Sequence, residues 1–328
     1  KYSQIAPCFR DEDARADRAP GEFYQLDMEM SYATQEEVFN VIEPVIYNTF
    51  KEFSDKAISN TPFTRIAYKE AMVKYGTDKP DLRNPLYIID LSDFFNKCTF
   101  KPFINRTVRA IKVKGHMSKG FHEKMLKYAT SIGMGGLGYL EVQEDLSYKG
   151  PIDKFIPDDL KKKLLDLAGL EKEDTIFFIA DNEKRATELA GQIRTELGKR
   201  LDLIKKDVFE FCWIVDFPMF ELDEHDKLQF SHNPFSMPQG GLDALTNEKP
   251  LDILAYQYDL VCNGVELSSG AVRNHDINIM IKAFEMAGYT EEEVKSKFGA
   301  LYTAFQFGAP PHAGIAPGFD RMLMLLTD

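Results

Sequence analysis

The hydrophobic residues at the start of the chain alternate with polar ones and then change to a helical spacing. Residues 1–10 and 22–32 show the alternation of half-buried β-strands, and a Pro-Gly pair in the polar stretch between them signals a turn. We therefore expect an antiparallel strand pair with a long connecting loop. Thr34, followed three positions later by a glutamate, precedes apolar residues at three- and four-residue spacing. This pattern predicts a capped amphipathic helix over 34–53.

The pattern changes again after the proline-punctuated segment 79–85. From there to residue 203, short strand-like and helical stretches follow one another without needing the first sheet, so we interpret 90–203 as an inserted domain. Strand-like stretches then return, followed by helical ones: 209–217 and 261–272, then 278–286, 290–305 and 318 onward. The sequence thus predicts an α+β protein in which 1–89 and 204–328 form one domain around the insertion.

Composition indicates a soluble protein of a reducing, cytoplasmic setting. Of the 328 residues 44% are hydrophobic, and no apolar run approaches the roughly 20 residues that cross a bilayer. The cysteines at 8, 98, 212 and 262 form no C-x-x-C pair that would suggest zinc or redox chemistry. The chain starts at Lys1 in strand-like sequence and stops at Asp328 in a helical pattern, so we expect it to be part of a longer protein.

The formal net charge of -12 argues against broad electrostatic binding of nucleic acid, because phosphate contacts need clustered Lys and Arg. Any RNA contact must then be local. The candidates are Arg10, Arg15, Arg18, Lys161 to Lys163, and Lys205 with Lys206. For the lysines, a solvated helix face is the simpler interpretation.

Gly133, Gly135 and Gly138 match the G-x-G-x-x-G pattern of dinucleotide-binding loops. That loop needs a strand before it and a helix after it, so that the pyrophosphate meets a helix N-terminus. Here the order is reversed, because a helical stretch over 121–132 precedes and a strand-like stretch over 139–142 follows. We predict a helix-to-strand turn instead.

Two groups of charged residues lie where predicted strands end. Arg10 ends the first strand, and Glu12 two positions later points to the same side, so both can face one phosphate-bearing ligand. Asp259, Glu266 and Arg273 surround a run of small residues against which a ligand can lie close to the backbone. Asp259 and Glu266 are candidate ligands for a phosphate-bound Mg²⁺. Structural ion pairing is the alternative for both groups.

A third group is the proline- and glycine-rich segment 308–318, which leads into an apolar helix starting Gly-Phe-Asp-Arg. Arg321 would lie in the first turn of that helix. The helix dipole disfavours a cation there unless the cation serves an anionic ligand. This placement indicates a functional role for Arg321.

Together the three groups resemble class II aminoacyl-tRNA synthetases. Residues 9–32 resemble motif 2 of that class and 308–326 resemble motif 3, with Gly-x-Asp-Arg as its signature end. Four segments resemble the bacterial-type aspartyl-tRNA synthetases: RDEDARADR at 10–18, FYQLD at 23–27, YGTDKPDLR at 75–83 and HNPF at 232–235. The resemblance covers essentially the whole chain. It implies an antiparallel sheet flanked by helices, with 90–203 as the extra α+β domain between motifs 2 and 3.

The resemblance also implies a role for each matching residue. ATP would be bound by Arg10, Asp11, Glu12, Phe23, Glu266, Gly318, Phe319, Asp320 and Arg321. Of these, Arg10 on the α-phosphate and Arg321 on adenine and the γ-phosphate would be catalytic. L-Aspartate would be bound by Arg10, Gln25, Asp27, His232 and Arg273, with His232 as a mobile lid residue and Arg273 forked on the side-chain carboxylate. Mg²⁺ would be held by Asp259 and Glu266.

The implied activity is ATP-dependent: aspartate becomes aspartyl-adenylate and is then transferred to the 3′ end of tRNA(Asp), with tRNA(Asn) open as a second substrate. The resemblance implies a cytoplasmic homodimer. Ala19 replaces a frequent glutamine, and Gly21 is extra, so one ATP contact is in doubt. Motif 1, the anticodon-binding domain and a further aspartate-binding segment would precede Lys1. We therefore expect this chain alone to be inactive.

Three other classes of protein remain as alternatives. A class II relative that works without tRNA, such as an ammonia-using asparagine synthetase, would share Arg10 and Arg321 but lack the inserted domain. A non-catalytic paralogue acting as a binding module would be expected to lose some of Arg10, Glu266 and Arg321, and all are present. An amidotransferase subunit can carry a related inserted domain, but it would lack motifs 2 and 3.

Overall fold

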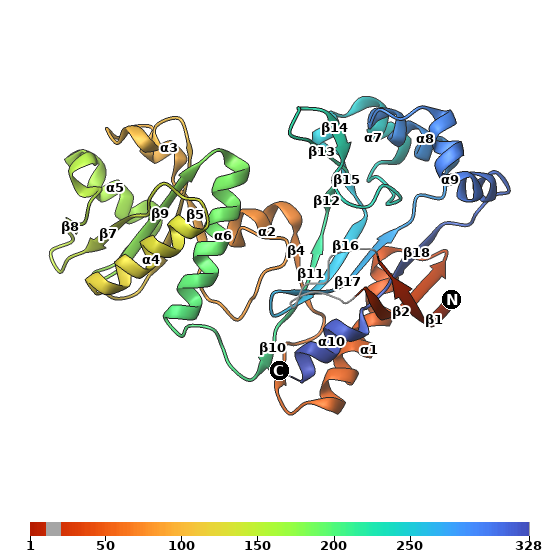
Figure 1. Cartoon of the computed structure of the whole chain (residues 1–328), viewed down its shortest axis with the longest axis horizontal. Coiled ribbons are helices and arrows are strands. Elements are labelled where there is room, and N and C mark those ends of the chain that lie inside the picture. The colour runs from red at the N-terminus through yellow and green to blue at the C-terminus, as the bar shows by residue number, and fades with distance from the viewer. Residues whose placement is uncertain (11–20, 328) are drawn as a thin grey trace. The chain divides into compact units, whose positions relative to one another are not determined.

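The computed structural model describes residues 1–10 and 21–327. The chain divides into two compact units, which we call the core unit (1–69 with 207–328) and the inserted unit (70–206). Each combines helices with a mostly antiparallel sheet, so the predicted α+β class is confirmed (Figure 1). The inserted unit encloses the range 90–203 that the sequence assigns to the insertion. Among the described residues, no helix is long and apolar enough to cross a membrane.

The core unit is built on a seven-stranded sheet with the strand order β1-β2-β18-β17-β16-β11-β4 (Figure 1). Its strands are β1 (Tyr2–Phe9), β2 (Glu22–Ser31), β4 (Thr64–Ala67), β11 (Phe211–Val215), β16 (Gln257–Cys262), β17 (Val265–Val272) and β18 (His312–Ile315). β1 and β2 pair antiparallel, as predicted. β18 lies between β2 and β17, so strands from opposite parts of the sequence are direct neighbours.

Helices α1 (Gln35–Phe53) and α10 (Phe319–Leu326) pack on the same face of this sheet. α1 begins with the predicted cap, since Thr34 Oγ1 accepts the Glu37 N–H and the Glu37 carboxylate accepts the Thr34 N–H at 2.7 Å. The core beneath α1 includes Trp213, whose Nε1 donates to buried Glu43 at 2.7 Å. Successive residues of a strand point to opposite faces of the sheet. In β2 and in β17, the residues that alternate with the core residues therefore face away from α1.

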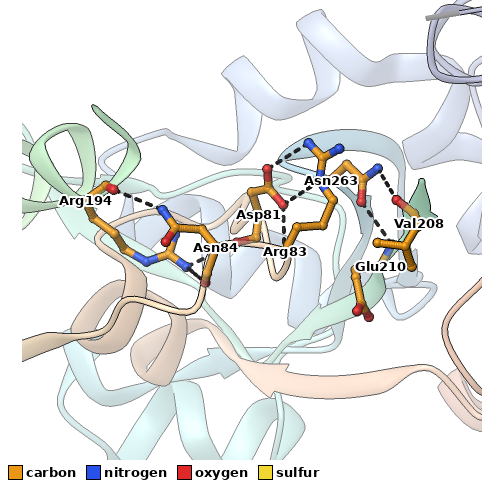
Figure 2. A network of polar contacts seen from close by, with 7 residues as sticks. All are labelled: Asp81, Arg83, Asn84, Arg194, Val208, Glu210 and Asn263. Atoms are coloured by element: carbon orange, nitrogen blue, oxygen red, sulfur yellow. Dashed lines mark hydrogen bonds and ion pairs between the residues drawn. The ribbon is translucent and has the colours of Figure 1, made fainter. Parts of the chain in front are cut away.

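The stretch 261–272 was expected to be one strand, and the structure corrects this to a hairpin. β16 and β17 are separated by Asn263 and Gly264, whose φ angles are 52° and 85°. Two positive φ angles in a two-residue turn favour the Asn-Gly sequence, which therefore carried a turn signal. The Asn263 side chain donates to the Val208 carbonyl at 3.0 Å and accepts the Glu210 N–H at 2.9 Å (Figure 2).

Three helices and several short strand pairs complete the core unit. The strands pair as β3 (Ala57–Ile58) with β10 (Val208–Phe209), β12 (Phe217–Pro218) with β15 (Leu254–Ala255), and β13 (Phe220–Leu222) with β14 (Leu228–Phe230). The helices are α7 (Gly241–Asn247), α8 (Ile277–Met286) and α9 (Glu291–Gln306). The helices predicted over 278–286, 290–305 and from 318 are confirmed as α8, α9 and α10.

The inserted unit has a five-stranded antiparallel sheet in the order β5-β6-β9-β7-β8. α2 (Tyr68–Tyr75) leads into it, and its elements are β5 (Ile88–Asp90), α3 (Ser92–Phe95), β6 (Thr107–Val113), α4 (Lys119–Ser131), β7 (Gly138–Val142), β8 (Tyr148–Lys149), α5 (Asp158–Ala168), β9 (Thr175–Asp181) and α6 (Glu183–Arg200). The segment with the three glycines joins α4 to β7, with Gly133 at φ 87°. The predicted helix-to-strand turn is therefore confirmed.

Within the inserted unit, one buried arginine fixes the chain ahead of β5 to α6. Arg194 is 1% exposed, and its guanidinium donates to the Leu86 carbonyl at 2.6 Å. It also donates to the carbonyls of Asn84 at 2.8 Å and Asp81 at 3.1 Å (Figure 2). The Asn84 side chain returns a bond to the Arg194 carbonyl at 2.9 Å. Burial lowers the pKa of Arg194, with nearby Tyr75 and Asp81 opposing the shift.

Replacing Arg194 by Met should destabilise this connection, because it leaves the buried carbonyls of Leu86 and Asn84 without their donor and removes one of the two donors to the Asp81 carbonyl. We expect the free energy of unfolding to fall by about 3 kcal/mol or more. Hydrogen exchange should show the loss of protection concentrated at 81–88, with β2 and β18 unchanged. Lys199→Met, an exposed position on the same helix, is the control. Equal protection in both variants would contradict this role for Arg194.

Candidate active site

A cavity of about 330 Å³ in the core unit brings together most of the predicted site residues. Its wall is formed by Arg10, Phe23, Gln25, Asn233, Glu266, Leu267, Ser268, Ser269, Arg273, Ala316, Gly318, Asp320 and Arg321. These residues come from the ends of β1 and β2, from β17 and the residue after it, from the loop that contains Asn233, and from the start of α10 with the segment before it. Asp27, His232, Asp259 and Phe319 are not part of this wall, and Asp11 and Glu12 lie outside the described residues.

Arg10 and Phe23 form a cationic and aromatic pair at the ends of β1 and β2. The guanidinium carbon of Arg10 lies 5.1 Å from the centroid of the buried Phe23 ring. The Arg10 N–H donates to the Gly21 carbonyl at 2.8 Å, which continues the ladder past Phe9. An aromatic face beside a permanently charged fork suits a ligand that has both a flat ring and a phosphate.

The start of α10 is tied to both β2 and β17. The Asp320 carboxylate accepts the Tyr24 N–H at 3.1 Å, and the Gly318 N–H donates to β17 at 2.9 Å. Arg321 Nη1 donates to the Glu266 carbonyl at 2.6 Å and lies 3.3 Å from the Glu266 carboxylate. Arg321 is thus held in the first turn of α10, where the helix dipole disfavours a cation. Its guanidinium lies beside Glu266 in the cavity wall.

Arg273 is engaged by a carboxylate that the sequence analysis missed. Its Nε and Nη2 both donate to Glu29 Oε1, at 3.0 and 2.6 Å, and the two side chains are only 22% and 31% exposed. The edge formed by Nη1 and Nη2 is the one that can take a second carboxylate. A signal for Glu29 was available, because it continues the every-second-residue pattern of Phe23, Gln25 and Asp27 along β2.

Two glycines make room for this pair. A Cβ at Gly314 would lie within 2.4 Å of Glu29 Oε1, and a Cβ at Gly270 would lie 2.4 Å from the Tyr258 ring. The Tyr258 hydroxyl donates to the Gly314 carbonyl at 3.0 Å. Burial raises the pKa of Tyr258, with Arg273 opposing the shift, so the hydroxyl stays a donor. Close packing of three strands therefore fixes Arg273.

Gln25 and Asp27 are neighbours on β2 but have different surroundings. Gln25 lines the cavity, donates to the Ala316 carbonyl at 3.3 Å and accepts from Cys8 Sγ at 3.3 Å. The Asp27 carboxylate accepts from Gln4 at 3.2 Å. The predicted contact of Gln25 with a ligand in this cavity is therefore geometrically direct, whereas Asp27 lies farther along the strand.

Asp259 and Glu266 lie on the two strands of the β16–β17 hairpin. Asp259 is 3% exposed and pairs with Ser269, which lines the cavity together with Glu266. Two carboxylates and a nearby hydroxyl offer the hard oxygen donors that Mg²⁺ prefers beside a bound phosphate. Among the described residues no group of three or more His, Cys, Asp or Glu side chains could hold a metal. Asp259 and Glu266 are thus candidate ligands by the chemistry of their oxygen donors, and Asp259 lies outside the cavity wall.

The loop that contains His232 turns the neighbouring Asn233 toward the cavity. The His232 ring packs edge-on against Tyr68 and Phe217, with centroid distances of 5.8 and 4.9 Å. His232 Nδ1 lies 2.8 Å from Ser231 Oγ. Asn233 is part of the cavity wall. The sequence analysis singled out the histidine through the family resemblance, and an irregular loop has no periodicity that would show which of two neighbours faces inward.

Comparison with known proteins agrees with the motifs. The family model for class II tRNA synthetases (D, K and N) matches residues 1–328. The aspartate–tRNA(Asp/Asn) ligases of Ehrlichia chaffeensis and Rickettsia canadensis are 56% and 53% identical to this chain over its full length. The chain spans 57% and 56% of the lengths of those relatives. Its sequence, its antiparallel sheet and its cavity therefore agree, and the chain belongs to the class II tRNA synthetase family.

Proposed function

We propose that this chain is the catalytic part of an aspartate–tRNA ligase. The observation that carries the proposal is one cavity that holds Arg273, a fork for a carboxylate, together with Arg10, Phe23 and Arg321, which suit a nucleotide. The names of the relatives, aspartate–tRNA(Asp/Asn) ligases, support aspartate as the amino acid and both tRNA(Asp) and tRNA(Asn) as acceptors. Since the chain spans little more than half of those relatives, the activity is proposed for the complete protein.

In the proposed complex, L-aspartate lies between Arg273 and Arg10. Arg273 binds the side-chain carboxylate through its Nη1–Nη2 edge, while Glu29 keeps the other edge and so fixes the plane of the guanidinium. Arg10 binds the α-carboxylate, and Gln25 contacts the amino acid from β2. Asp27 is proposed to meet the ammonium group, and His232 to approach as a lid residue.

ATP is proposed to bind with its adenine on Phe23 and its phosphates between Arg10 and Arg321, assisted by Asp11, Glu12, Gly318, Phe319 and Asp320. The α-carboxylate of aspartate then attacks the α-phosphate in line, and pyrophosphate leaves. A ribose hydroxyl of the tRNA next takes the aspartyl group from the adenylate. No side chain acts as the nucleophile, so catalysis comes from positioning and from the arginines that balance charge on the phosphate oxygens.

Asp259 and Glu266 would hold Mg²⁺ in this complex, and their oxygen donors fit that role. The cation would supply charge neutralisation on the phosphates of ATP. The Glu266 carboxylate also lies 3.3 Å from Arg321 Nη1, so the same side chain orients the arginine.

A homodimer and a cytoplasmic location are also proposed for the complete protein, on the strength of the family. The rival functions are less well supported. An ammonia-using asparagine synthetase would not explain the inserted unit. A non-catalytic paralogue would not need Arg10, Glu266, Arg273 and Arg321 together in one cavity. Aspartate-dependent ATP–pyrophosphate exchange, followed by aminoacylation of purified tRNA(Asp) and tRNA(Asn), tests the proposal.

Substituting Arg273 should damage the recognition of aspartate more than that of ATP. In the complete protein, Arg273→Ala should lower aspartate-dependent pyrophosphate exchange by at least ~100-fold, because a charge-assisted fork is lost. Arg273→Lys should also be impaired, since an ammonium cannot bridge two carboxylates in one plane. Near-normal exchange by Arg273→Ala would remove this residue from the amino-acid site.

The orientation of Arg273 by Glu29 gives a second prediction. Glu29→Gln keeps an acceptor oxygen for Arg273 and should change the KM for aspartate by less than about threefold, whereas Glu29→Ala removes the acceptor and should raise it by ~10-fold or more. The KM for ATP should stay constant in both, which separates this effect from general misfolding. If Glu29→Ala matches the parent protein in aspartate KM, Glu29 does not orient Arg273.

A further inference from the structure

Asn233 occupies a fixed position on the cavity wall. Its N–H donates to the buried Gln257 side chain at 3.2 Å, and its carbonyl accepts the Ser236 N–H at 3.2 Å. Its side-chain oxygen accepts the Phe235 N–H at 2.9 Å, which closes an Asx turn. Three hydrogen bonds therefore hold both the backbone and the side chain of Asn233.

The residues that follow Asn233 run antiparallel to the end of β17. Ser236 lies directly opposite Arg273, with a backbone hydrogen bond on each side of the pair, 2.8 and 2.7 Å long. Bonds that flank a pair in this way mark a non-hydrogen-bonded pair of an antiparallel ladder, in which the side chains of the two residues lie closest. The loop is thus attached beside Arg273, and Asn233 and Arg273 share one small cavity of about 330 Å³.

The Asx turn fixes the orientation of the Asn233 side-chain amide relative to the cavity. A backbone N–H can only donate, so the atom it contacts must be the side-chain oxygen. That oxygen is turned back into the loop, which leaves the Nδ2 amino group, with two N–H donors, as the outward end. Within the described part of the chain, Nδ2 has no hydrogen-bond partner.

We propose that Asn233 is a specificity-determining residue whose Nδ2 donates to the side-chain carboxylate that Arg273 binds. This inference rests on the proposed function. A carboxylate is acceptor-only, so it can accept from both Arg273 and Asn233. Asparagine offers one acceptor oxygen and an amino group, so at least one of these donors would face an N–H instead. Asn233 therefore adds to the preference for aspartate over asparagine.

The test is an isosteric exchange, Asn233→Asp, in the complete protein. The new carboxylate can still accept the Phe235 N–H and keep the Asx turn, but it replaces the donor by a negative charge facing the substrate. We expect the KM for aspartate in pyrophosphate exchange to rise by ~100-fold, with the KM for ATP changed by less than about twofold and Tm preserved. Asn233→Ser removes Nδ2 without adding a charge, and its shorter hydroxyl can accept the Phe235 N–H, so it should raise the aspartate KM by ~10-fold.

Asn48→Asp is the matched control, because it makes the same exchange at an exposed position of α1 that is not part of the cavity wall. If both Asn233 variants show the same aspartate KM as Asn48→Asp, the inference is overturned. A purely structural role for Asn233 would lower Tm in Asn233→Ser while Asn233→Asp kept the parent KM, and it would overturn the inference equally. If the parent protein shows no aspartate-dependent exchange, the proposed function itself fails, and this inference fails with it.

Discussion

The placement of β18 between β2 and β17 is the constraint on which the candidate site depends. Its register puts Gly314 opposite Glu29 on one side and opposite Ala271 on the other. The alternate residues Ala313 and Ile315 enter the core beneath α1. A slip of β18 by one residue would send those apolar side chains toward the cavity and remove the space that Gly314 leaves for Glu29. The core thus selects the register, and the register sets the position of Arg273.

Local patterns in the sequence predicted the elements of the core unit well. The strand alternation of β1 and β2, the Thr34 cap of α1 and the apolar helix after Gly318 each depend on residues close together in the chain. The hairpin of β16 and β17 was missed although the Asn263-Gly264 pair is a turn signal. The apolar residues on either side of the pair were interpreted as one continuous strand. Periodicity identifies an extended segment but does not show where it reverses.

The chemistry of the cavity was predicted in part, for a different reason. Arg10 and Arg321 stand in the segments that resemble motifs 2 and 3, and Glu266 and Arg273 belong to a charged group that the sequence analysis singled out. Glu29 also lies within 9–32 but was not singled out, because its importance comes from Arg273, 244 positions away in the sequence. No local rule relates residues so far apart, since their contact exists only through the β2–β18–β17 ladder. Asn233 escaped notice for a related reason: a hydrogen bond within an irregular loop, and not a pattern, turns it toward the cavity.

Each arginine of the cavity already has an internal partner, which shapes how a substrate can bind. Arg273 pairs with Glu29, Arg321 with Glu266, and Arg10 lies over Phe23. An unpaired guanidinium in a partly buried cavity would be costly, so these partners stabilise the arginines in their positions. A substrate must then compete with them or use the edges they leave open. Arg273 shows the second solution, because Glu29 takes one edge of its fork and fixes the other. In the proposed complex, selectivity for a carboxylate therefore depends on the orientation of the guanidinium as well as on its charge, and a neighbouring donor such as Asn233 can add to it.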